Sequence, residues 1–199
     1  MPRSPADNAR MRAQTRRALL DAALEVAAER GFHGASIARI AERAGVSKAL
    51  VFKHFASKDK LLEALLEAGL QGVGQAFSSA QQATSPQQRL RALIAPGFAF
   101  VREHPRFWRL ISQLRMQDGV QRGLGAALPA TTQGITRQIE AELRALGTPD
   151  PELDARVLWA AIDGATQHYL LDPQGYPLEA VQERLIAMYL ELGSTGGTQ

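Results

Sequence analysis

The apolar residues of this chain recur three and four positions apart, and almost no stretch alternates apolar with polar residues. Spacing of three and four places apolar side chains on one face of an α-helix, whereas strict alternation would indicate a strand. Prolines and glycines stand between the helical segments, where they interrupt a helix most readily. The pattern therefore predicts an all-α protein.

The same spacing sets the bounds of the expected helices. The first is expected from about Thr15 to Arg30, after an arginine-containing arm, and should end at Gly31. After two short helices, Ser57 is placed to cap a helix that runs towards Gly69. Five further helices are expected at residues 86–104, 105–117, 128–146, 151–171 and 178–192.

Residues 36–55 carry the most informative pattern, which is two short amphipathic helices joined by a glycine turn. Ser36 is placed to cap the first helix, and Ser47 is placed to cap the second. Between them Gly45 ends the first helix, since glycine tolerates the left-handed backbone of a tight turn. Lys48 and His54, with Lys53, then point outward from the second helix. This arrangement is a helix-turn-helix, whose second helix enters the major groove of DNA.

Charge is distributed unevenly along the chain. Residues 1–60 hold twelve Lys and Arg against six Asp and Glu, although the formal net charge of all 199 residues is only +3. The four lysines of the chain lie on the second helix of the helix-turn-helix or just after it: Lys48, Lys53, Lys58 and Lys60. A basic cluster alone is as often a solvated face as a binding surface, but beside a helix-turn-helix it favours nucleic acid.

Composition narrows the class of protein. Hydrophobic residues make up 45% and charged residues 22% of the chain, which is typical of a globular protein with one or two cores. The sequence has no run of 18 apolar residues and an arginine-rich start, so we expect a cytoplasmic protein. Cysteine is absent, which excludes disulfides and thiolate metal sites.

Three groups of residues together resemble the N-terminal domain of the TetR family of bacterial transcriptional regulators. They are the G-F pair at 31–32, the I-A-x-x-A-G-V-S sequence at 40–47 and the H-F-x-S-K-D sequence at 54–59. Ser36 stands where the family often has Thr. The resemblance implies a homodimer whose second helices bind the half-sites of an inverted repeat. It also implies a C-terminal domain that binds an effector and weakens DNA binding, and most relatives are repressors.

The resemblance further implies which residues meet DNA. Lys48 and Ala49 would approach the bases, and Ser36, Phe52, His54 and Lys58 would lie along the phosphates. Ser47, Leu50 and Lys53 complete the expected interface. Two residues depart from the family pattern, because Ala49 stands where Gly is common and Phe52 where Tyr is common.

Alternatives stay open on this second helix. Val46, Val51 and Phe55 are expected in the core, and Phe52 is compatible with either the core or the surface. His54 is compatible with a phosphate contact or with an ordinary exposed position, since histidine can donate a hydrogen bond in either charge state.

The last two helices are expected to form a dimer interface. Small residues on the first permit close helix approach, and an apolar stripe runs along the second: Ala160, Ala161, Gly164 and Ala165, then Val181, Leu185, Met188 and Leu192. Pairing with the same helices of a second chain would form a four-helix bundle with two-fold symmetry. The same stripes would alternatively complete the core of a single chain.

An effector pocket is expected between the C-terminal helices. Its expected lining combines aromatic and polar side chains: Phe100, Trp108, Met116, Trp159, Asp163, Gln167 and His168. Phe98, Phe107 and Tyr169 are further aromatic candidates, although aromatic residues at helical spacing are equally typical of a plain core. A small hydrophobic molecule is the favoured effector.

The sequence offers little support for an enzyme. It contains no G-x-S-x-G, H-E-x-x-H or Walker-type motif. The glycines at 69, 72 and 74 follow a helix rather than a strand, so we interpret them as a helix end and a flexible joint. His168 and Asp172 are two possible metal ligands without a third. We expect no catalysis, cofactor or metal.

These observations predict three parts of the chain. Residues 1–60 form an arm and a three-helix DNA-binding domain with the helix-turn-helix, residues 61–192 a helical effector-binding and dimerisation domain, and residues 193–199 a disordered tail. The predicted function is that of a ligand-responsive transcriptional repressor. The alternative is an architectural DNA-binding protein without an effector, which would explain the basic residues but not the long apolar-patterned C-terminal part.

Overall fold

The computed structural model describes residues 4–78, 83–115 and 127–195 of the chain. Within these ranges the regular structure comprises nine α-helices and no strand, as the hydrophobic pattern predicted. Among the described residues, one compact unit holds 4–69 and 109–115, and a second holds the rest. No helix in these ranges is both long and apolar enough to cross a membrane.

Helix α1 (Pro5–Gly34) is longer than the sequence pattern predicted, because it begins at Pro5 rather than near Thr15. The Ser4 side chain accepts a hydrogen bond from the Asp7 N–H at 3.1 Å, and Pro5 occupies the first turn, where its missing N–H costs no helical hydrogen bond. Gly31 interrupts the helix as expected, with φ 72° and ψ 167°. The Ser-Pro-Ala-Asp sequence at 4–7 is the signal for this helix start, and the prediction overlooked it.

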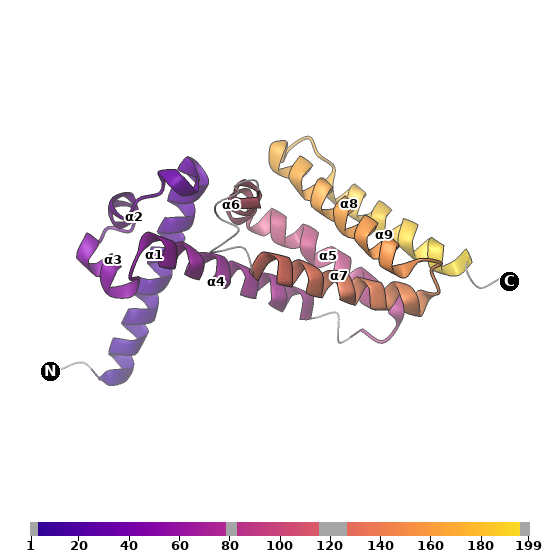
Figure 1. Ribbon diagram of the computed structural model, residues 1–199, viewed down its shortest axis with the longest axis horizontal. Coiled ribbons are helices and arrows are strands. Elements are labelled where there is room, and N and C mark those ends of the chain that lie inside the picture. The colour runs from indigo at the N-terminus through magenta and orange to yellow at the C-terminus, as the bar shows by residue number, and fades with distance from the viewer. Residues whose placement is uncertain (1–3, 79–82, 116–126, 196–199) are drawn as a thin grey trace. The chain divides into compact units, whose positions relative to one another are not determined.

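Helices α2 (Ile37–Arg43) and α3 (Lys48–His54) form the expected helix-turn-helix beside α1 (Figure 1). The Ser36 hydroxyl accepts a hydrogen bond from the Arg39 N–H at 3.3 Å, and the Ser47 hydroxyl accepts one from the Leu50 N–H at 3.2 Å. Gly45 between them has φ 66°, in the left-handed region that glycine adopts without strain. Both caps and the turn confirm the local prediction.

Helix α4 (Lys58–Ser78) corrects the expectation for the glycines at 69, 72 and 74, because all three lie inside it. The Ser57 hydroxyl accepts a hydrogen bond from the Lys60 N–H at 3.2 Å, as predicted. Each glycine disfavours a helix by roughly 1 kcal/mol relative to alanine. Burial of Val73 and Phe77 offsets this cost. At Gly72 a Cβ atom would lie only 3.3 Å from Phe100 Cε2, so the small residue allows a close approach.

The second unit is built on four helices that run alongside one another (Figure 1): α5 (Pro86–Glu103), α7 (Ala127–Leu146), α8 (Pro151–Leu171) and α9 (Leu178–Thr195). Their facing sides bury a continuous apolar core: Leu90, Ile94, Ile139, Leu158 and Ile186. Ion pairs join the helices at the surface, with Arg89 bound to Glu142 and Arg102 to Glu179, each at 2.8 Å. The short helix α6 (Pro105–Arg115) follows α5 directly.

The C-terminal helices have nearly the expected bounds. Prolines begin α5, α6 and α8 where the sequence placed them. Helix α9 continues to Thr195, three residues into the tail that was expected to be disordered, and residues 196–199 lie outside the described ranges. The glycine-rich stretch at 117–125 also lies outside them.

A candidate DNA interface and an interior cavity

The outer face of α3 presents most of the residues that were expected to meet DNA. Ser47, Lys48, Ala49 and Lys53 are exposed, and Leu50 is half-buried. Phe52 is 53% exposed, so it lies on the surface rather than in the core. The opposite face anchors the helix through two buried residues and one half-buried residue: Val51, Phe55 and Val46.

Ser36 and Lys58 flank this face at the start of α2 and of α4. Both are half-buried. The Ser36 hydroxyl is engaged in capping α2, which leaves its second lone pair and its own proton for a further hydrogen bond. Their contact with phosphates stays a prediction.

An ion-pair cluster holds α2 against α1. Arg43 of α2 binds Glu29 and Glu25 of α1, with nitrogen–oxygen distances of 2.9 Å. The hydrogen bonds to Glu29 and then Glu25 raise the pKa of Arg43 above its ordinary value. The first helix of the helix-turn-helix is thereby fixed in orientation, and α3 is positioned through it.

A second basic group, which belongs to the arginine-containing segment at the start of the chain, lies where α1 passes the end of α3. The guanidinium carbon of Arg16 lies 4.7 Å from the centre of the Phe55 ring. Burial lowers the pKa of the half-buried His54, and the charges of Arg12, Arg16 and Lys53 lower it further. The signal available in the sequence was the spacing of positions 12 and 16, which continue the apolar face marked by Leu19.

A small apolar cavity lies among α4, α5, α6 and α8 in the second unit. Four of the residues expected to bind an effector line it: Phe100, Trp108, Trp159 and Asp163. The Phe100 and Trp108 rings pack edge to face with their centres 6.2 Å apart. The cavity volume is about 20 Å³, which is room for about one water molecule and not for an effector.

The other expected pocket residues lie elsewhere. Gln167 is half-buried and His168 is exposed, with its ring stacked on Tyr176 at 5.8 Å, and neither lines the cavity. Met116 lies outside the described residues. Phe98 and Phe107 are buried, and Tyr169 is half-buried.

Five lining residues were not expected from the sequence. Val73 and Phe77 were overlooked because the predicted helix ended before them, near Gly69. The other three carry smaller or aliphatic side chains, which an aromatic pattern does not single out: Gly97, Ile162 and Thr166.

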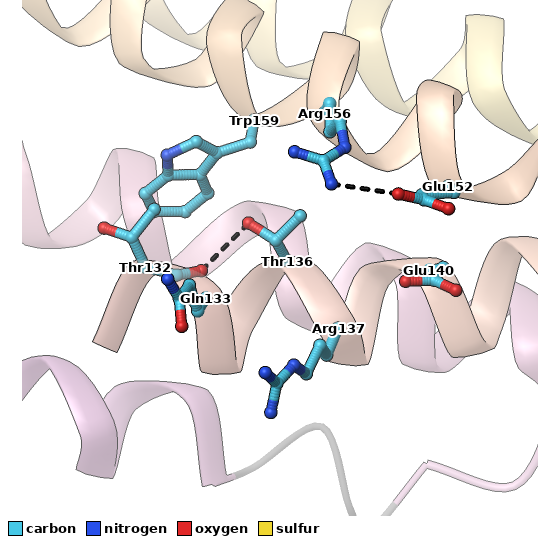
Figure 2. Close-up of a pocket in the computed structure, with 8 residues that line it drawn as sticks. All are labelled: Thr132, Gln133, Thr136, Arg137, Glu140, Glu152, Arg156 and Trp159. Atoms are coloured by element: carbon cyan, nitrogen blue, oxygen red, sulfur yellow. Dashed lines mark hydrogen bonds and ion pairs between the residues drawn. The ribbon is translucent and has the colours of Figure 1, made fainter. Parts of the chain in front are cut away.

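A polar groove of about 610 Å³ lies between α7 and α8, and Trp159 is among the residues that line it. Figure 2 shows Trp159 and Arg156 of α8 facing Thr132 and Thr136 of α7. Arg156 is bound to Glu152 at 2.9 Å. Trp159 lines both the groove and the cavity. Within the described ranges no three acidic, histidine or cysteine side chains cluster as metal ligands.

The outer face of α8 is apolar and exposed. Leu153, Val157 and Leu171 are 55%, 52% and 83% exposed, and they follow one another at helical spacing with Ala160 and Gly164 between them. Of the four small residues expected at an interface, Ala160 and Gly164 face outward, Ala161 is half-buried and Ala165 is buried. On α9, Met188 is 45% exposed, and Val181 and Leu185 are half-buried. The Leu192 side chain lies outside the described ones.

Two family descriptions match this chain. Residues 19–65 match "Bacterial regulatory proteins, tetR family", and residues 86–192 match "BetI-type transcriptional repressor, C-terminal". The transcriptional regulator BetI 1 of Chromohalobacter salexigens is 31% identical, over 84% of this chain and 85% of its own length. The transcriptional activator FasR of Mycolicibacterium smegmatis is 39% identical over 50% of this chain. That alignment covers only 46% of FasR, so this chain matches less than half of that relative.

Solved structures share the fold. A transcriptional regulator from Rhodococcus sp. RHA1 superposes with a TM-score of 0.78 at 25% identity, covering 92% of this chain and 99% of that one. FadR from Bacillus subtilis, solved in complex with stearoyl-CoA, superposes with a TM-score of 0.71 at 20% identity, covering 87% and 96%.

Proposed function

Because this chain belongs to the TetR family and is a transcriptional regulator of that family, we propose that it is a repressor that a small effector releases from DNA. It binds an inverted-repeat operator as a homodimer. The observation that carries the proposal is the outer face of α3, where Lys48, Ala49, Phe52 and Lys53 are exposed on a capped helix. A helix with these side chains can contact base edges and phosphates from within the major groove.

The homodimer is supported by the exposed apolar face of α8. Large apolar side chains in a contiguous row on a protein surface are typical of an interaction site. Here they flank Ala160 and Gly164, which permit close approach of a second helix. A two-fold pairing of this face would give a dimer with two copies of α3, one for each half-site of an inverted repeat.

A hydrophobic effector is supported by the aromatic cavity and by Trp159, which the cavity shares with the polar groove. The cavity is too small for a ligand as it stands, so an effector has to displace Phe100, Trp108 or Trp159. Because Trp159 lines both spaces, an amphipathic ligand that displaces it would meet apolar residues of the cavity and polar residues of the groove. The FadR protein that shares this fold was solved with stearoyl-CoA, a ligand of that chemical type.

Helix α6 could transmit effector binding to the DNA interface, because the same helix carries a cavity residue and a residue beside α1. Trp108 near its start lines the cavity. Further along, Gln113 lies beside the kink of α1, where a Cβ atom at Gly31 would be 3.9 Å from Gln113 Oε1. Displacement of Trp108 by a ligand would shift the helix that carries Gln113, and with it the helix against which α2 is held.

The test is selection of random double-stranded DNA by the purified protein, with sequencing of the bound pool at moderate salt. Enrichment of an inverted repeat supports the proposal and supplies the operator for effector screening by loss of binding. Binding without enrichment, with a steep salt dependence, would instead indicate an architectural protein. Absence of binding would contradict the function altogether.

A further inference from the structure

The first turns of α1 form an exposed basic helix. Residues 8–14 are all exposed, and Figure 1 shows this end of α1 extending past α3. The Ser4 cap and Pro5 set the start of the helix locally, and Asp7 in its first turn is favoured by the helix dipole. Because these turns are ordered without burying a core, their surface is free to contact a partner at little cost in conformational entropy.

The charge on these turns lies on a particular face. Leu19 and Ala23 belong to the buried face of α1 and are each 0% exposed. Counting back from Leu19 by three and then four residues reaches Arg16 and Arg12, which are exposed. The face that is apolar inside the core is therefore basic where α1 extends beyond it. An apolar partner would strip water from two guanidinium groups without replacing it, so this face is suited to an anion.

This basic face is continuous with the DNA interface. Arg16 lies over the ring of Phe55, which directly follows α3. Arg12 and Arg16 are close enough to His54, the last residue of α3, for their charges to lower its pKa. Lys53 adds a further exposed positive charge at the same end of α3.

We propose that the Arg12 and Arg16 face of α1 binds the phosphate backbone of the DNA that flanks each half-site. The inference rests on the proposed function, since it requires α3 in the major groove. At 1.5 Å per residue, residues 5–15 extend about 16 Å, which is roughly the length of four to five base pairs. Phosphates carry no sequence information, so this contact adds affinity and lengthens the site without changing base preference.

The test compares the salt dependence of binding for two double variants of the full chain. Arg12→Ala with Arg16→Ala removes the proposed contact. Arg10→Ala with Arg17→Ala removes the same charge from the opposite side of the same helix, about 140° away from Arg12 in the case of Arg17. The probe is a 40-base-pair duplex carrying the selected operator, titrated at 50 mM and 200 mM salt.

For the Arg12 and Arg16 variant, the ratio of affinities at the two salt concentrations should fall about 3-fold for each phosphate that the protein no longer neutralises. The control should change this ratio much less. Because Arg16 also contacts Phe55, Arg12→Ala alone is measured against Arg17→Ala, and the circular dichroism of each variant reports folding. Equal decreases in both pairs would overturn the proposal, since they would reflect net charge rather than a local interaction with phosphate.

A second measurement changes the length of the DNA instead of the residues of the protein. Trimming the duplex to the ends of the two half-sites should weaken binding of the wild type but not of the Arg12 and Arg16 variant, because that variant does not bind the flanking phosphates. Equal sensitivity to trimming would overturn the proposal. Failure of the wild type to bind any duplex would overturn the proposed function itself, which keeps the two failures distinct.

Discussion

Phe52 is an apolar residue at an exposed position of α3, the helix that we expect to enter the major groove. It presents a 53% exposed ring on the recognition helix, where the family commonly has Tyr. Phe52→Tyr adds a hydroxyl that can donate a hydrogen bond to a phosphate. We expect DNA binding to tighten by about 1 kcal/mol, roughly 5-fold, on any sequence. Fluorescence anisotropy with the operator and with a random duplex measures this.

Lys48→Ala provides the contrasting variant. Lys48 is exposed at the start of α3, so its loss should reduce the difference between operator and random DNA rather than affinity alone. Unchanged affinity for Phe52→Tyr, together with unchanged base preference for Lys48→Ala, would contradict the assignment of phosphate and base contacts on α3.

His54 carries a pH dependence of stability. Burial, then Arg12, Arg16 and Lys53, lower its pKa below 6.5 in the folded protein, so the unfolded chain takes up a proton first as the pH falls. The stabilising effect of neutral His54 is therefore complete above about pH 6.5 and is lost as the pH falls from there towards the folded pKa. We expect the free energy of unfolding in urea to decrease in this window.

His54→Gln supplies the control for this effect, because glutamine keeps a hydrogen-bonding side chain but does not titrate. The variant should lose less stability than the wild type between pH 7.5 and 5.5. An identical loss in both proteins would place the responsible group elsewhere.

At the scale of the helix, α5 contributes Gly97, which has no side chain, to the lining of the cavity. A Cβ atom at Gly97 would lie 3.5 Å from Ile162 Cγ2, which is an ordinary packing distance. Gly97→Ala should stabilise the protein by about 1 kcal/mol, because alanine is the better helix former. It also fills part of a cavity of about 20 Å³, so we expect weaker release from DNA by effector. Urea unfolding and an effector titration measure the two effects.

Gly134→Ala on α7 is the matched control, since a Cβ atom there would meet nothing within 4 Å. It should stabilise the protein similarly and leave the effector response unchanged. A response that weakens equally in both variants would show that stability, not cavity volume, governs release.

At the scale of the molecule, the proposed dimer depends on the exposed face of α8. A single chain can accept a substitution on this face without a change in its own packing. A Cβ atom at Gly164 would meet nothing within 4 Å, so Gly164→Glu leaves the fold of one chain intact. In a dimer it would insert a charge where two copies of α8 approach closely. We expect sedimentation velocity to show dissociation, with operator affinity reduced at least 10-fold.

Gly134→Glu again serves as the control, because it makes the same substitution at an exposed glycine of α7. It should leave the association state of the protein unchanged. A wild type that sediments as a monomer, or a Gly164→Glu variant that remains a dimer, would contradict the assignment of this face.

The sequence by itself determined the helices and the helix-turn-helix, because these depend on interactions between residues a few positions apart. Ser36 and Ser47 cap their helices through hydrogen bonds to residues three positions later. Gly45 makes the turn between the helices through its own backbone conformation. The match of the family to residues 19–65 rests on the same local pattern. The early start of α1 was equally local in origin, although the Ser4 cap was overlooked.

Only the tertiary structure decided which residues share a site, because that depends on how helices distant in sequence meet. Val73 and Phe77 join Trp159 at the cavity only because packing carries α4 through its glycines. His168 lies only five residues after Asp163 on the same helix, but the rotation of α8 leaves it exposed. Arg16 meets Phe55 because α1 passes the end of α3. Side-chain periodicity specifies a face, and only packing specifies what that face meets.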